Sequence, residues 1–150
     1  MNSNYPHWNF FRILESDLEK CFRYIEPTKS HYSVFSDEFG KIILLACSEI
    51  ENALKTLARD ITPEINIGGI KDCRESIIRK YPKFGLIKIS LPRYGIVVQP
   101  WESWYENDTA PDWWSNGYNV VKHDRVRVFK ILCQRELISR CAHLVFPQNV

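Results

Sequence analysis

Four polar side chains near position 120 combine types and spacings that suit the cleavage of a phosphodiester bond. Asn119 and His123 are four residues apart, so they would share one face of a helix. Lys122 and Arg125 are three residues apart and would share a neighbouring edge. Histidine can transfer a proton near neutral pH, a cation can neutralise charge developing on a phosphate, and an amide can orient a 2′-hydroxyl or a phosphate oxygen. The segment therefore predicts a site that could cleave RNA without a metal ion.

The same stretch resembles the signature region of HEPN domains, which are helical bundles found widely in prokaryotic toxin, abortive-infection and RNA-processing proteins. Catalytic HEPN domains carry an Arg followed four to six residues later by a His, often with an Asn directly after the Arg. Asn119 and His123 match the Asn and the His, whereas Tyr118 stands where the Arg is expected. Trp113 and Trp114 precede the motif, as in a branch of uncharacterised HEPN-like proteins. The resemblance covers residues 33–125 and is most specific at 113–125.

The resemblance implies an RNA-binding or ribonuclease-type protein, of the kind that serves as a toxin or a phage-defence effector, with its active site formed in a homodimer. It implies that His123 is the general acid and base, that Asn119 orients the substrate, and that Arg125 binds the phosphate. In such proteins a polar residue on the long second helix also faces the motif, and this chain has the run Ser48–Asn52 there. The residues expected to bind substrate are Lys122, Tyr118, Arg127, Glu49 and Asn52.

The tyrosine at position 118 keeps a second interpretation open. In it the protein is a non-catalytic helical module for RNA, a nucleotide or a partner protein, and the polar cluster is structural or holds an anion. His123 would then be a structural hydrogen-bonding residue. A third interpretation is a structural subunit whose Trp-rich segment, from Trp101 to Trp114, docks onto another protein. Trp113 itself is expected to be a core anchor, like Trp114, rather than a platform for RNA bases.

Charge along the chain is uneven. The formal net charge of +2 is too small to indicate a nucleic-acid partner by itself. Between residues 120 and 143, however, six basic residues stand against two acidic ones. Such a concentration is typical of a phosphate-binding patch and equally of a solvated helix face. The basic residues are Lys122, Arg125, Arg127, Lys130, Arg135 and Arg140, and the acidic ones are Asp124 and Glu136.

The remaining composition narrows the class of protein. The five cysteines have neither C-x-x-C spacing nor a histidine at zinc-finger distance, so we expect no metal, no other cofactor and reduced thiols. The longest strongly apolar stretch, from Ile42 to Cys47, is far shorter than a membrane span, and residues 1–8 lack the features of a signal peptide. A chain of 150 residues fits one domain over 1–150. The prediction is a single cytoplasmic domain with no membrane partner.

Apolar residues at steps of three and four predict the helices that would position the site. The second helix has the clearest boundaries, because Ser36 is a candidate N-cap, two acids follow it, and Thr62-Pro63 closes it. The fourth begins near Pro111, since proline suits a first helical turn. The last rests on periodicity alone. The predicted helices span 9–25, 37–61, 71–80, 111–125 and 126–145.

Residues 84–99 have a different pattern, with short apolar runs on either side of Pro92–Gly95. This pattern predicts a β-hairpin between the third and fourth helices. Residues 100–112, which contain Pro100, Asn107 and Pro111, are expected to form a long loop. The predicted fold is therefore all-α, a bundle of four to five helices with a small β-hairpin insertion around 86–98. The resemblance implies that this bundle is HEPN-like.

Overall fold

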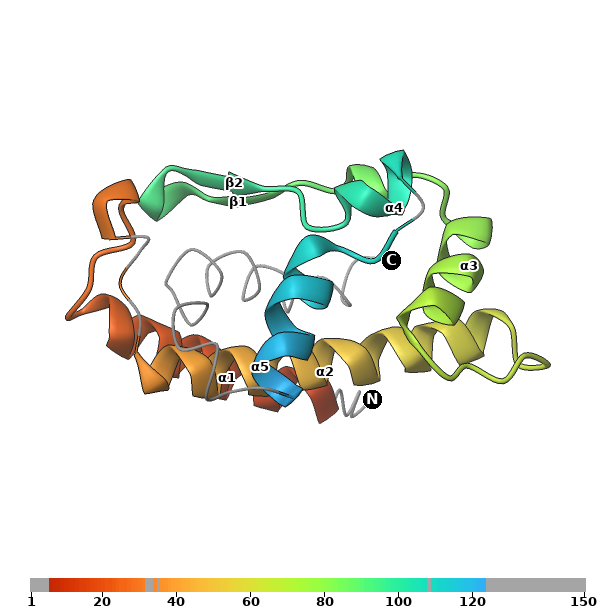
Figure 1. Cartoon of the computed structure of the whole chain (residues 1–150), viewed down its shortest axis with the longest axis horizontal. Helices are drawn as coiled ribbons and strands as arrows, with labels where there is room; N and C mark the ends of the chain where they lie inside the picture. Colours follow the sequence, from red (N-terminus) through yellow and green to blue (C-terminus); the bar gives the residue numbers. More distant parts are fainter. Residues whose placement is uncertain (1–5, 32–33, 35, 108, 124–150) are drawn as a thin grey trace, which may run out of the picture.

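The computed structural model describes residues 6–31, 34, 36–107 and 109–123. These residues form a mainly helical protein with one two-stranded antiparallel hairpin (Figure 1), which confirms that part of the predicted fold. The predicted helix over 126–145 lies outside the described residues. The elements are α1 (Pro6–Phe22), α2 (Asp37–Ile61), α3 (Ile70–Lys80), β1 (Ile89–Leu91), β2 (Ile96–Val98), α4 (Glu102–Glu106), the π-helix η4 (Trp113–Tyr118) and α5 (Asn119–His123), with short 3₁₀ turns η1 (Lys29–His31), η2 (Phe84–Leu86) and η3 (Pro92–Tyr94).

The long helix α2 is the centre of the fold, and both of its ends lie where the sequence predicts. Ser36 is the N-cap, and its hydroxyl oxygen accepts a hydrogen bond from the Phe39 amide at 3.1 Å. Asp37 and Glu38 occupy the first turn, where the positive end of the helix dipole favours acids. Thr62 follows the last turn as the C-cap. The apolar stripe of α2 is buried against α1 on one side and against α3, η4 and α5 on others.

Helix α1 runs antiparallel to α2 along the lower edge in Figure 1 and buries Phe11, Leu14 and Cys21. It occupies 6–22 rather than the predicted 9–25. The start is earlier because Pro6 suits a first helical turn. The end is earlier because residues 23–25 form a turn hydrogen-bonded back to positions 20 and 21.

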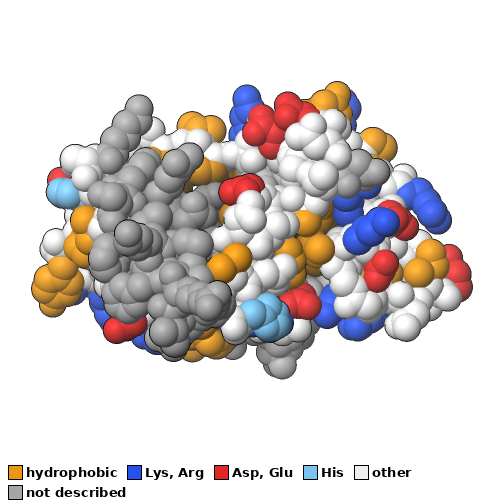
Figure 2. Space-filling model, in the orientation of Figure 1, with side chains coloured by type: hydrophobic (Ala, Val, Ile, Leu, Met, Phe, Trp, Pro, Cys, Tyr) orange, Lys and Arg blue, Asp and Glu red, His pale blue; other side chains and the backbone are white. Residues whose placement is uncertain are grey.

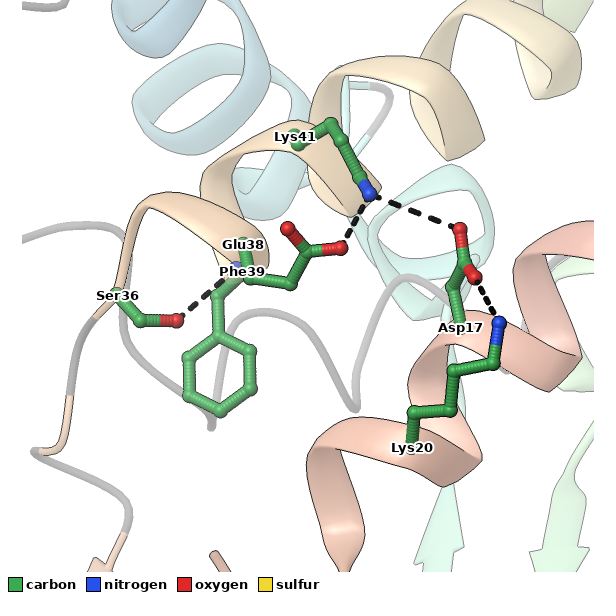
Figure 3. Close-up of polar contacts among 6 residues, drawn as sticks. All are labelled: Asp17, Lys20, Ser36, Glu38, Phe39 and Lys41. Carbon is green, nitrogen blue, oxygen red and sulfur yellow. Dashed lines mark hydrogen bonds and ion pairs between the residues drawn. The ribbon is translucent and has the colours of Figure 1, made fainter. Parts of the chain in front are cut away.

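Ion pairs on the surface link α1 and α2. Figure 3 shows Asp17 of α1 between two lysines, with one carboxylate oxygen 3.0 Å from the Lys20 ammonium and the other 3.7 Å from that of Lys41. Lys41 also contacts Glu38 on its own helix. These charges are partly exposed, so they orient the helix pair more than they stabilise it.

Helix α3 and the hairpin follow the predicted pattern. The third helix begins at Ile70, one residue before its predicted start, and buries Cys73 and Ile77. In the hairpin Ile89 pairs with Val98 and Leu91 with Ile96. The turn between them closes at Gly95, whose φ of +62° lies in the left-handed region that favours glycine.

The segment predicted as a loop over 100–112 contains the short helix α4, and its tryptophans are buried. Trp101 and Trp104 are 2% and 1% exposed and pack against Phe84 of η2. Gly85 makes this packing possible, because a Cβ there would lie 2.7 Å from the Cβ of Tyr105. Aromatic burial outweighs the loop-forming composition, which is the reason that the loop prediction was wrong for 102–106.

Among the residues that the structure describes, no helix is both long enough and apolar enough to cross a membrane.

Candidate functional site

The candidate site lies on a helix whose first part is wound more loosely than the sequence predicts. The sequence predicts a regular α-helix from residue 111 onward, but Trp113–Tyr118 form a π-helix. The backbone N–H of Asn119 donates a hydrogen bond to the carbonyl oxygen of Trp114, five residues earlier. The chain returns to α-helical winding at Asn119. One extra residue per turn rotates everything that follows by about 100° relative to a continuous α-helix. The π-helix therefore decides which way the motif faces.

Three predicted site residues lie together on α5. Asn119 is half-buried, and Lys122 and His123 are exposed at the end of the described helix. Asn119 and His123 share a helix face, as predicted. Within the described part of the chain, neither of these two side chains makes a hydrogen bond or an ion pair. Arg125 and Arg127 lie outside the described residues.

Tyr118, which the resemblance would align with the Arg of HEPN domains, is buried and only 4% exposed. Its ring packs against Trp114, with ring centroids 4.9 Å apart, and the Lys122 ammonium lies 5.3 Å from its centroid. Burial raises the pKa of the Tyr118 hydroxyl, with a smaller opposing effect from the charge of Lys122. Tyr118 is therefore a neutral core residue, and Lys122 is the nearby cation.

On α2 the structure separates the two glutamates of the run Ser48–Asn52. Glu49 contacts the Nδ1 atom of His7 on α1, and both side chains are partly buried. Asn52 is exposed, and its backbone carbonyl accepts from the Thr56 hydroxyl at 2.9 Å. Glu51 is the acid whose charge acts on Tyr118. Side chains two positions apart on a helix differ in direction by about 200°, so Glu49 and Glu51 contact different neighbours.

His7 on α1 contacts Glu49 on α2, a contact that no pattern in the sequence predicts. The two residues are 42 positions apart, and only the packing of α1 on α2 brings them together. His31 has local partners, because its Nδ1 atom lies 3.0 Å from the carbonyl oxygen of Glu26 and 3.3 Å from the hydroxyl of Thr28. The sequence spacing therefore gave no indication of the His7–Glu49 contact, whereas the three-residue spacing of Thr28 and His31 indicated theirs.

Among the described residues, the basic side chains visible in Figure 2 lie mostly toward one end of the molecule. Figure 2 shows Lys and Arg side chains mainly at the right, over α3 and the adjoining end of α2. Glu51, whose charge acts on Tyr118, forms an ion pair with Lys55, and their charged atoms are 2.7 Å apart. Glu51 is thus neutralised by a lysine of its own helix.

The described residues contain no group of three or more potential metal ligands among His, Cys, Asp and Glu. Cys21, Cys47 and Cys73 are buried. Burial raises the pKa of the Cys73 thiol to about 11, so this thiol is protonated at neutral pH. These three cysteines are hydrophobic core residues rather than nucleophiles.

The four tryptophans between 101 and 114 are all buried. The Trp113 indole nitrogen also donates to the Pro100 carbonyl oxygen at 3.0 Å. The prediction that Trp113 and Trp114 are core anchors is confirmed. The burial of these four indoles removes most of the aromatic surface that motivated the interpretation of this segment as a docking surface; Tyr105 alone of its aromatic residues is exposed, and the interpretation stays a prediction.

Comparisons of the chain with family models, with curated proteins and with solved structures find no significant match. The resemblance to HEPN domains accordingly stays a prediction.

Proposed function

We propose that the protein binds RNA and cleaves it without a metal ion, at a HEPN-like site centred on His123. The observation that supports this most directly is the exposure of His123 beside the exposed Lys122, one helical turn after Asn119. An exposed imidazole can reach a phosphodiester, and the neighbouring ammonium can attract one. The charge on Lys122 is not taken up by an ion pair with any described carboxylate, so it is available to the substrate.

In the proposed reaction the 2′-hydroxyl of a nucleotide attacks the adjacent 3′-phosphate and the bond from phosphorus to the 5′-oxygen breaks. The products are a 2′,3′-cyclic phosphate and a free 5′-hydroxyl. His123 accepts the proton of the 2′-hydroxyl, and the partner subunit's His123 donates a proton to the leaving oxygen. Asn119 orients the substrate, and Lys122 neutralises the phosphate together with Arg125.

The proposal extends to the cellular role that the HEPN resemblance suggests. A ribonuclease of this kind would act in the cytoplasm as a toxin or a phage-defence effector. Its partners would be RNA, a second copy of the chain and a protein that restrains it.

A second candidate function is a non-catalytic RNA-binding or nucleotide-binding module. The burial of Tyr118 favours it, because a neutral side chain inside the core cannot supply the positive charge that arginine brings to a HEPN active site. In this function Lys122 and His123 hold a phosphate that is not cleaved.

Incubation of the purified protein with labelled single-stranded RNA in excess EDTA separates the two functions. We expect the wild type to produce fragments ending in a 2′,3′-cyclic phosphate, and His123→Ala to lose this activity by about 100-fold or more, the usual contribution of a general acid–base group. His31→Ala is the matched control, since the partners of His31 among the described residues lie within 26–31, and it should leave cleavage unchanged.

Equal cleavage by His123→Ala and the wild type would show that the activity is not centred on this residue. RNA binding by the wild type without cleavage would establish the second function in place of the first. Analytical ultracentrifugation of the same samples tests the homodimer.

A further inference from the structure

A chain of packed aromatic rings ends at Tyr118. Ring centroids are 5.3 Å apart between Trp101 and Trp113, 5.7 Å between Trp113 and Trp114, and 4.9 Å between Trp114 and Tyr118. All four rings are buried, so each restricts the movement of the next. The last ring therefore offers a fixed face at the start of α5.

Lys122 follows Tyr118 by four residues and lies above this ring. Its ammonium nitrogen is 5.3 Å from the ring centroid, within the range at which the ring quadrupole attracts a cation. The nearby carboxylate of Glu51 is engaged by Lys55 at 2.7 Å. Among the described residues Lys122 has no ion-pair partner, so the ammonium can bind an anion on the side that faces away from the ring.

We propose that Tyr118 is a positioning residue, which holds the Lys122 ammonium beside His123 as the cation that binds the RNA phosphate. The inference rests on the proposed function, because it takes RNA to be the ligand. A lysine side chain loses considerable rotamer freedom when it is immobilised. A ring that restricts Lys122 before RNA arrives reduces this loss, so the phosphate is bound more tightly.

The first test is direct and needs no RNA. Protons above an aromatic ring resonate upfield, so the ε-methylene protons of Lys122 should lie upfield of those of the exposed Lys71 and Lys83, which have no described ring contact, in an NMR spectrum of the wild type. Tyr118→Phe should keep this shift, and Tyr118→Leu should remove it. A wild-type Lys122 signal at the position of the other exposed lysines would overturn the proposal.

The second test is a double-mutant cycle on RNA affinity, measured by fluorescence anisotropy with a 2′-O-methyl oligonucleotide that cannot be cleaved. Tyr118→Leu should weaken binding about two- to fivefold, and Tyr118→Phe, which keeps the ring but loses the hydrogen bond between its hydroxyl and Lys122, should weaken it less. Lys122→Met should weaken binding further and reduce the slope of log K against log salt by about 0.7. In the Lys122→Met background, Tyr118→Leu should have no additional effect, because the cation it positions is already gone.

Equal effects of Tyr118→Leu in both backgrounds would overturn the positioning role, since a general structural disturbance does not depend on Lys122. Loss of affinity in Tyr118→Phe as large as in Tyr118→Leu would overturn it too, because the hydroxyl would then be the active group. Thermal unfolding identifies any variant that fails to fold. If Tyr118→Leu does not fold, the proton shift of Lys122 in the wild type and the RNA affinity of Tyr118→Phe test the positioning role. A wild type that binds no RNA overturns the proposed function and the substrate role of Lys122 together, whereas binding with an additive cycle overturns the positioning role alone.

Discussion

The hydroxyl oxygens of Thr62 and Ser76 lie 2.6 Å apart in the interior between α2 and α3. Thr62 also donates to the Ala58 carbonyl at 3.0 Å, so the Ser76 hydroxyl is left to donate to Thr62. Each of the two hydroxyls thus gives the other a hydrogen-bond partner at a place that water does not reach. This pair joins the end of α2 to the helix that follows it.

Thr62→Val should therefore destabilise the protein by about 1–3 kcal/mol, because it leaves the buried Ser76 hydroxyl without its acceptor. Ser76→Ala should cost less, since Thr62 keeps its bond to Ala58. The free energies of unfolding from urea titrations of the two variants measure the difference. A larger loss in Ser76→Ala than in Thr62→Val would contradict this assignment of donor and acceptor.

Gly85 should not tolerate a side chain. A Cβ there would lie 2.7 Å from the Tyr105 Cβ and 2.8 Å from the Trp101 carbonyl oxygen, so α4 would have to move away from η2. We expect Gly85→Ala to lower the free energy of unfolding by about 1–3 kcal/mol. Gly69→Ala is the control for a steric clash, because nothing lies within 4 Å of its Cβ position. Gly69 is the N-cap of α3, where alanine is disfavoured, so we expect a loss of roughly 0.5–1 kcal/mol, smaller than that of Gly85→Ala. Equal effects of the two substitutions would show that α4 does not pack as described.

The contact of Asp17 with lysines should make stability depend on pH in acid. The hydrogen bond from Lys20 and the charge of Lys41 hold the pKa of Asp17 below its ordinary value of 3.8. The folded state therefore favours the charged carboxylate. Its contribution is present above pH 3.8 and is lost as the pH falls through the lower folded value.

Asp17→Asn should consequently reduce the dependence of the unfolding free energy on pH below about pH 4, with a small loss at neutral pH because the pair is partly exposed. Glu19→Gln, an exposed neighbour with no described ion pair, is the control and should leave the pH profile unchanged. Parallel profiles of Asp17→Asn and the wild type would contradict the lowered pKa.

The Cys73 thiol should be unreactive in the folded protein. Its pKa of about 11 leaves almost no thiolate at pH 8, and its side chain is buried. Alkylation by iodoacetamide at pH 8, followed by peptide mass spectrometry, should be slow for Cys73 in the native state and fast in urea. Rapid modification of the native protein, at the rate found in urea, would show that the interface between α2 and α3 opens readily.

Much of the fold could be predicted because the signals are local. The boundaries of α2 follow from Ser36, which satisfies a free amide of the first turn, and from Pro63, whose preceding residue cannot remain helical. The hairpin follows from two β-branched runs around Pro92–Gly95, where Gly95 takes the left-handed conformation. In each case the energetic preference lies within a few residues of the position that it determines.

The candidate site depends partly on such local signals and partly on packing. Asn119 and His123 share a face because helix geometry places them so, and this could be predicted from their spacing alone. Tyr118 could be recognised as a departure from the HEPN pattern, but its burial and the placement of Lys122 above its ring could not. The contact of Glu49 with His7 on α1 could not be predicted either, because the two residues are 42 positions apart in the sequence.

The sequence by itself determined the long central helix, the third helix, the hairpin and the spacing of the polar motif. The tertiary structure alone decided that Trp104 lies in a helix and, like Trp101 just before it, inside the core, that Trp113–Tyr118 wind as a π-helix, and that Lys122 meets the Tyr118 ring. The physical reason is that caps and turns depend on neighbouring backbone groups, whereas the burial of large aromatic rings depends on contacts between distant segments. Those contacts yield enough free energy to change the winding of a helix and thereby the direction in which its polar residues face.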